Sequence, residues 1–329
     1  MLIKMFEFSI LIPILLSISR YENFRIYLFA FLIGILLTSA LILLDYFGYK
    51  FYLGFGKASS KTPFVSSISQ GILFTFAIFI SLNEIWKNIN SNSSRKPLTF
   101  MWFFILFILI FIQFDSNSRA GQVGMIVALF IFFSRNFKFR DFLILFFTLT
   151  IFIFGISYSY SDNFKVRVDR VFIETSEHLQ GNYEATSIGL RLYWYKKTLE
   201  IIEDNFWLGV GMGDYKESLT EKMKEDDTSI KPHVNPHNMY LLIFSTTGIF
   251  GLIFFLNIFV LLTLRSLKDK DKKKSHYGLF LSVFFLSIMM ADSYLLGHVT
   301  QQLFAVILAG IFSKPYISKN EDSSNYSKI

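Results

Sequence analysis

The chain has 329 residues, of which 53% are hydrophobic and 41 are phenylalanine, and its mean hydropathy is +0.45. A soluble domain of this length cannot bury so much apolar surface, so the composition predicts an integral membrane protein. The chain contains no cysteine, which excludes disulfides, thiolate metal ligands and thiol nucleophiles. A net charge of +7 is typical of a membrane protein with basic cytoplasmic loops, and we expect no nucleic-acid partner.

Hydrophobic runs follow one another along most of the chain, and a membrane-spanning helix needs about 20 apolar residues. The first run is short and covers residues 8–19. Long runs without any charged residue cover 26–44, 64–83, 98–114, 142–161 and 239–264. Further apolar runs cover 120–134, 277–291 and 295–313. We therefore predict an all-α fold, a polytopic transmembrane helix bundle of about nine spans.

Two basic loops orient the predicted bundle. One loop, residues 135–140, carries three cations, and the other, residues 265–274, carries six. Because lysine and arginine concentrate on the cytoplasmic side, we expect both loops there. The segment between them, 162–237, then forms one large extracytoplasmic loop with short helices. It separates N-terminal transmembrane helices at 1–161 from C-terminal transmembrane helices at 238–313, which a cytoplasmic tail at 314–329 follows.

The external segment contains an amphipathic helical pattern that ends near Asn205. Apolar residues recur at steps of four and three, at Ile188, Leu192, Tyr195, Leu199 and Ile202. Arg191 falls beside this stripe, so we expect its side chain to be half covered. Such an arginine either binds a ligand or only covers apolar surface with its stem.

Three glycines follow the helix, at Gly209, Gly211 and Gly213 in the sequence WLGVGMGDY. A tight turn built from them could expose backbone N–H groups to an anion. The spacing is not that of a dinucleotide-binding fingerprint, and a flexible turn is the simpler interpretation.

A proline-rich stretch leads back to the membrane and carries a histidine. Pro236 favours a helix start, which places His237 and Asn238 in the first turn of the span at 239–264. The unpaired N–H groups of that turn would favour an anion nearby. His233 lies four residues earlier, but the intervening prolines argue against a helical two-histidine metal face, so we expect no metal.

Another arginine lies near the same predicted membrane surface. Asp115 and Arg119 belong to a short turn between two spans. Drawing an arginine into the membrane costs roughly 2.5–3.5 kcal/mol, so Arg119 is a candidate functional residue. Contact with a lipid phosphate is the equally simple alternative.

These residues resemble a known family. His237-Asn238, nine further residues and then GIFG from Gly248 reproduce the pattern H-[NSQ]-x9-G-x-x-G of the O-antigen ligases, in the wider O-antigen ligase and polymerase superfamily. RLYW from Arg191, followed by LGVGMGDY ending at Tyr215, resembles the family segment R-x-x-W…G-x-G-x-x-x-Y. SRAG, residues 118–121, is similar to the family turn S-R-[GA]-G. The similarity covers about residues 113–251, whereas family members usually have more spans before this portion.

The resemblance implies a metal-independent glycosyltransferase of the bacterial cytoplasmic (inner) membrane, with its active site facing the periplasm. Members transfer a glycan from undecaprenyl pyrophosphate to a glycolipid or glycan acceptor, without a cofactor. Arginines would hold the pyrophosphate, and a histidine would accept the proton of the acceptor hydroxyl. The implied catalytic residues are His237, Arg191 and Arg119, and the implied substrate-binding residues are Asn238, Trp194, Gly211, Gly213 and Tyr215.

Three functions stay open at this point. The first is a ligase that moves a finished polysaccharide onto lipid A-core, and the second is a polymerase that joins carrier-linked repeats. The third is a transporter with a polar path lined by Asp292, His298, Gln301 and Gln302. No internal repeat or matched pair of broken spans supports transport, and these polar groups could instead close the side of a catalytic cavity.

Overall fold

The computed structural model is helical, and no strand occurs among the residues that it describes. Its description covers residues 14–15, 24–49, 64–91, 96–116, 118–179, 186–224, 226 and 230–312. The predictions for the first hydrophobic run and for the tail fall outside these residues, except at 14 and 15.

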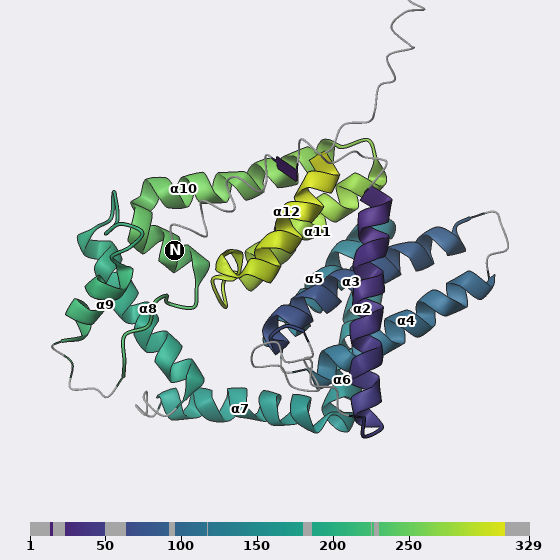
Figure 1. Ribbon diagram of the computed structural model, residues 1–329, viewed down its shortest axis with the longest axis horizontal. Coiled ribbons are helices and arrows are strands. Elements are labelled where there is room, and N and C mark those ends of the chain that lie inside the picture. The colour runs from purple at the N-terminus through teal and green to yellow at the C-terminus, as the bar shows by residue number, and fades with distance from the viewer. Residues whose placement is uncertain are drawn as a thin grey trace, which may run out of the picture.

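The helices form a bundle and a smaller group beside it (Figure 1). The bundle contains α2 (Phe24–Tyr46), α3 (Ser67–Ile89), α4 (Lys96–Asp115), α5 (Arg119–Asn136), α6 (Phe139–Tyr160), α10 (Met239–Lys268), α11 (Lys272–Ile288) and α12 (His298–Phe312). The smaller group contains α7 (Asp162–Leu179), α8 (Ser187–Asp204) and α9 (Tyr215–Met223). A short 3-10 helix, η2 (Tyr294–Leu296), precedes α12.

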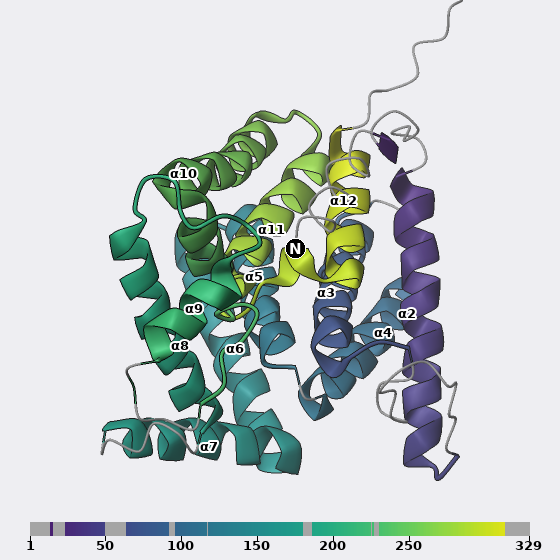
Figure 2. The same cartoon turned by 60° about the vertical axis from the view of Figure 1, so that its left-hand side comes forward.

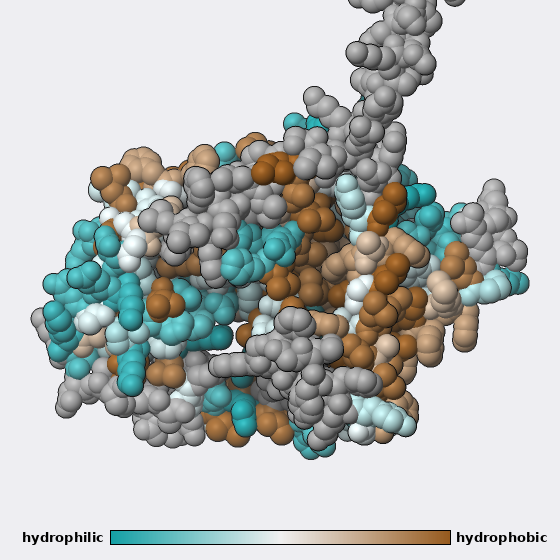
Figure 3. All heavy atoms as spheres, viewed as in Figure 1, coloured by the Kyte–Doolittle hydropathy of each residue, from teal (hydrophilic) through white to brown (hydrophobic). Residues whose placement is uncertain are grey.

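Five described helices, α2, α3, α4, α6 and α10, are long and apolar enough to cross a membrane, and α12 is a shorter apolar helix. This confirms the predicted all-α membrane fold, whereas the count of about nine spans stays a prediction. Side chains of α6 and α10 are apolar yet mostly exposed, which suits contact with lipid. Hydrophobic residues accordingly gather over the bundle in the space-filling view, and hydrophilic ones over α8 and α9 (Figure 3).

The core of the bundle lies between α3 and α11. In the most apolar stretch of α3, 72% of the residues are buried, compared with 11% in α6, so α3 is surrounded by protein. Phenylalanine rings fill the interface: Phe79 stacks on Phe280 with ring centroids 4.0 Å apart, and Phe76 meets Phe284 edge to face at 5.1 Å. Figure 2 shows α12 on the outside of α11, toward α2.

The two predicted basic loops meet at one end of the bundle. The Nη2 of Arg135, at the end of α5, donates to Ser275 Oγ, near the start of α11, over 3.1 Å. Arg25, Lys87 and Lys273 lie together at this end, around one hollow. Since α5 and α11 run antiparallel, Arg119 and the end of α11 lie at the opposite end.

The smaller group of helices has its own core. Ile201 of α8 packs with Tyr215 and Leu219 of α9 and with Leu242 of α10. The Thr198 and Tyr215 hydroxyls lie 2.8 Å apart. This core fastens α8 and α9 to the first turns of α10.

The helix predicted to end near Asn205 is confirmed, because Asn205 is the C-cap of α8. Its predicted apolar stripe is wrong at two positions, since Leu192 and Leu199 are exposed. The buried face includes Lys197 and Thr198 instead. Lys197 Nζ lies 3.2 Å from Glu200 and 3.0 Å from Asp226, and these two partners make its burial possible.

Glycines bring α3 and α5 unusually close. A Cβ on Gly121 would lie 2.8 Å from the Cα of Gly71 and would collide with the Gln113 amide. The Gly121 carbonyl accepts a hydrogen bond from Thr75 Oγ1 over 2.9 Å. Small residues at such a crossing allow backbones to approach within a membrane.

We expect Gly121→Ala to destabilise the protein by about 1–3 kcal/mol, because the added methyl group must push α3 and α5 apart. Gly155→Ala in α6 is the matched control, since a Cβ there meets no atom within 4 Å. Thermal unfolding in detergent measures both. Equal melting temperatures for the two variants would contradict the tight crossing.

The orientation can be tested with two exposed lysines at opposite ends, Lys216 in α9 and Lys270 between α10 and α11. In cells with a permeabilised outer membrane, Lys216→Cys should react with a membrane-impermeant thiol reagent, and Lys270→Cys should not. The native chain has no cysteine, so each label reports one position. Labelling of Lys270→Cys alone would reverse the predicted orientation.

Candidate functional site

His237 lies just before α10 in a strained backbone conformation. Its φ of 56° makes it the one non-glycine residue with positive φ among the described residues. Asn235 Oδ1 accepts its N–H over 2.8 Å, and its carbonyl accepts the Tyr195 hydroxyl over 3.1 Å. The predicted position in the first helical turn is therefore wrong: Asn238 is the N-cap, and His237 precedes it.

The start of α10 has no N–H groups to spare for an anion. Asn238 Oδ1 accepts from the N–H groups of Tyr240 and Leu241, over 3.0 and 3.2 Å. The Met239 N–H donates to the Met289 carbonyl over 2.9 Å. The predicted anion site on these N–H groups is thus already filled by protein acceptors, and Asn238 serves as a helix cap.

His237 contacts a carboxylate from a distant part of the chain. Its Nδ1 lies 3.2 Å from Asp292 Oδ1, and both side chains are largely buried, with exposed fractions of 22% and 23%. A carboxylate on Nδ1 fixes that nitrogen as the donor and leaves Nε2 as the free acceptor. The pair therefore has the geometry of a general base and the residue that orients it.

Asp292 is held in its ionised form. Burial is the largest single influence on the pKa of Asp292, and it acts against ionisation. Hydrogen bonds from His237 and from the Ser293 N–H, together with the positive charge of Arg191, outweigh this effect. The pKa of Asp292 therefore lies below its ordinary value. The Ser293 N–H lies 2.7 Å from Asp292 Oδ1. An ionised carboxylate at this distance holds the imidazole ring of His237 in one orientation.

Aromatic rings cover one side of His237. The His233 ring stacks on His237 with centroids 4.5 Å apart, and the Trp194 ring lies 5.1 Å from His233 and 5.6 Å from His237. The prolines thus keep the two histidines off one helix, as predicted, yet the turn still brings them together. No cluster of three or more histidine or acidic side chains able to hold a metal occurs among the described residues.

Arg191 presents its charge to this site from α8. It is half-buried, as predicted, and it shares a helix face with Trp194 and Tyr195. Its charge acts on Asp292 and on Tyr195, whose pKa burial raises despite that cation. Within the described part of the chain, no carboxylate lies within 4.0 Å of the guanidinium. The arginine therefore remains available to an anionic ligand.

Arg119 lies at the same end of the bundle as the histidine. It is half-buried at the start of α5, where Ser118 Oγ caps the helix by accepting the Gly121 N–H over 3.1 Å. No described hydrogen bond or ion pair joins Arg119 to His237 or Arg191. The Ser-Arg-Ala-Gly turn is thus explained by its cap and its glycine crossing, and the role of Arg119 stays a prediction.

The glycine turn packs against α10, and Met212 within this turn lines an apolar cavity. Gly248 interrupts α10 with φ 66° and ψ −170°, and Gly209 crosses there so closely that a Cβ on it would lie 2.7 Å from the Gly248 nitrogen. The Gly211 N–H donates to the Thr246 carbonyl over 3.0 Å, so it is not available to the predicted anion. A Cβ on Gly213 would meet no atom within 4 Å.

Tyr215, which the resemblance assigns to substrate binding, lies in the core instead. Only 2% of it is exposed. Burial raises its pKa to about 12, against the hydrogen bond with Thr198. Its role in the structure is to pack α9 onto α8.

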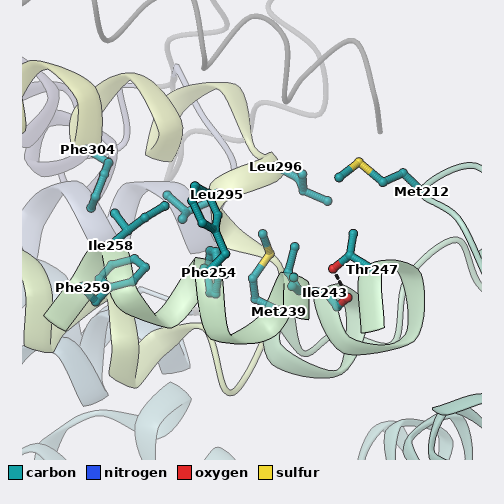
Figure 4. Close-up of a pocket in the computed structure, with 12 residues that line it drawn as sticks. Met212, Met239, Ile243, Thr247, Phe254, Ile258, Phe259, Leu295, Leu296 and Phe304 are labelled. Carbon is teal, nitrogen blue, oxygen red and sulfur yellow. Dashed lines mark hydrogen bonds between the residues drawn. The ribbon is translucent and has the colours of Figure 1, made fainter. Parts of the chain in front are cut away.

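An apolar cavity of about 260 Å³ lies along α10 and reaches η2 and α12 (Figure 4). Met239 lies two residues after His237, and Leu295 three residues after Asp292, and both line it. The rest of its wall is largely apolar and includes Phe254, Ile258 and Phe304, with Thr247 as a polar residue. The cavity is therefore lined by residues close in the chain to both His237 and Asp292.

Sequence reasoning missed Asp292 as the partner of His237. The sequence places Asp292 either in a transport path or at the side of a catalytic cavity. The contact between Asp292 and His237 supports the second position. A signal was present, because Asp292 is the sole acidic residue between 272 and 313.

The comparisons with known proteins agree with these motifs. Residues 104–256 match the family model described as O-antigen ligase, and this range contains Arg119, Arg191 and His237. No curated protein was found to match the chain. This match, over slightly less than half of the chain, supports membership of the O-antigen ligase family.

Proposed function

We propose that the protein is an O-antigen ligase-type glycosyltransferase, which moves a glycan from undecaprenyl pyrophosphate onto lipid A-core in the bacterial inner membrane. The contact between His237 and Asp292, beside the positive charge of Arg191, is the observation that carries the proposal. A base and a phosphate-binding cation are the two groups that such a transfer needs.

The reaction follows from this arrangement. The oxygen of the acceptor hydroxyl attacks the anomeric carbon of the donor, and its proton passes to His237 Nε2. The bond between that carbon and the pyrophosphate oxygen breaks, and the charge that builds on the pyrophosphate is stabilised by Arg191 and Arg119. Asp292 holds the histidine ring and stabilises its protonated form. No metal is required in this scheme.

The apolar cavity beside the site suits the lipid part of the donor. A carrier lipid presents a charged pyrophosphate directly attached to a long hydrocarbon chain. Met239 and Leu295, which line the cavity, follow His237 by two residues and Asp292 by three, so head and tail could be held together. We place the periplasm on this side, opposite the basic loops.

The test of the function is deletion of the gene, followed by analysis of surface polysaccharide. For a ligase, long polymer should remain on its carrier lipid while lipid A-core stays unmodified. Acceptor capped with a single repeat would instead indicate a polymerase that joins carrier-linked repeats. Unchanged polysaccharide would contradict both functions.

Variants of the purified enzyme should distinguish the general-base role of His237 from the phosphate-binding role of Arg191. We expect His237→Ala to lower turnover by about 10²–10⁴-fold with donor affinity nearly unchanged. Arg191→Ala should weaken donor binding and slow transfer together, and Arg191→Lys should recover only part, because lysine lacks the planar two-donor fork.

The control for these variants is Arg140→Ala, an exposed arginine at the opposite end of the bundle. Donor affinity and turnover should be measured with EDTA present, since the scheme uses no metal. The assignment of the base fails if His237→Ala keeps most of its turnover or loses donor binding as severely as Arg191→Ala. Activity that returns only with magnesium or manganese would contradict the arginine-based account.

A further inference from the structure

A second hollow lies at the end of the bundle that carries the basic loops. Its volume is about 270 Å³, and it lies between α2, α3, α4 and the start of α11. Its charged rim contains Arg25, Lys87, Lys273 and one carboxylate, Glu84. Its apolar wall contains Leu28, Phe29, Leu32, Ile80, Leu98, Met101 and Trp102.

The rim carries more positive than negative charge. Lys87 Nζ lies 3.4 Å from Glu84, but no carboxylate of a described residue lies within 4.0 Å of Arg25 or Lys273. Lys273 is close enough to Arg25 and Lys87 to be repelled by both, while Glu84 and Asp271 attract it. It is held instead against aromatic rings, 5.8 Å from the centroid of Phe24 and 5.9 Å from that of Tyr277.

The start of α2 adds to this positive field, since its first turn has no acidic residue. The start of α11 does not, because the Asp271 carboxylate caps it by accepting from the N–H groups of Lys273 and Lys274. Helix N-termini favour an anion, whereas a cation placed there, such as Arg25, is unfavourable. An anion between these groups would relieve the repulsion among the three cations.

A free anion would leave the apolar wall uncovered, and a neutral lipid would leave the cations uncompensated. The hollow thus requires a ligand with a negative head and a hydrocarbon tail, at the depth where a membrane surface meets basic and aromatic side chains. We propose that this hollow binds an anionic phospholipid, with its phosphate at Arg25, Lys87 and Lys273 and an acyl chain along Trp102. Basic pockets between transmembrane helices bind anionic head groups for this reason.

The proposal is tested with the full chain in micelles of a neutral detergent, by native mass spectrometry and thermal unfolding. Phosphatidylglycerol is the probe, and phosphatidylcholine with the same acyl chains is the neutral reference. The double variant Arg25→Gln/Lys87→Gln removes two exposed side chains, so the fold should persist. The matched control is Lys268→Gln/Lys270→Gln, which removes two exposed charges at the same end but outside the hollow.

We expect the wild type to prefer phosphatidylglycerol, and the hollow variant to lose roughly 30-fold in affinity for it. The control variant should lose less than about threefold. An equal loss in both variants would overturn the proposal in favour of general surface attraction. Equal binding of phosphatidylcholine, or displacement of the lipid by inorganic phosphate alone, would overturn it as well.

If the hollow variant fails to unfold cooperatively, a second double variant tests the proposal. Arg25→Lys/Lys87→Arg keeps both charges and should retain phosphatidylglycerol binding within about threefold. Loss of binding in this pair would show that the shape of the side chains, rather than their charge, controls the hollow, against the proposal.

Discussion

The geometry of the site depends on the contact between the backbones of Gly209 and Gly248. An unbroken α10 would pair the Ser245 carbonyl with the Ile249 N–H, but the break at Gly248 frees both groups. The loop after α8 takes them up: the Val210 N–H donates to Ser245, and Ile249 donates to the Phe206 carbonyl, each over 2.9 Å. Unsatisfied groups would be costly at a membrane boundary, so these bonds lock the end of α8 onto α10. Arg191 and Trp194 thereby face His237.

Much of the fold could be predicted from hydropathy, because a membrane span must be apolar along its whole length. The end of α8 followed equally well from local signals, because Asn205 is its C-cap. The buried face of α8 did not, since Leu192 and Leu199 match the helical period but lie away from α9 and α10. Tertiary contacts choose which face of an amphipathic helix is covered, and the sequence of one helix does not contain them.

In the candidate site, too, local features could be predicted from the sequence and tertiary contacts could not. Local motifs identified His237 and Arg191, because each belongs to a short pattern with fixed spacing. The partner of the histidine, Asp292, lies 55 residues further along the chain. It reaches the site because α11 returns to the end of the bundle where α10 begins, as the bond between Met239 and Met289 shows. A pairing of this kind depends on bundle topology, which hydropathy alone leaves open.

The strain at His237 is best understood through what it achieves. A positive φ costs a non-glycine residue of order 1 kcal/mol, and it persists only when the surroundings enforce it. Two hydrogen bonds hold this conformation: Asn235 Oδ1 accepts the His237 N–H, and the Tyr195 hydroxyl donates to the His237 carbonyl. The chain thus spends stability to hold the histidine outside α10, between a carboxylate and the aromatic rings of α8 and its own turn. Such rigid placement lowers the reorganisation that a proton transfer at Nε2 requires.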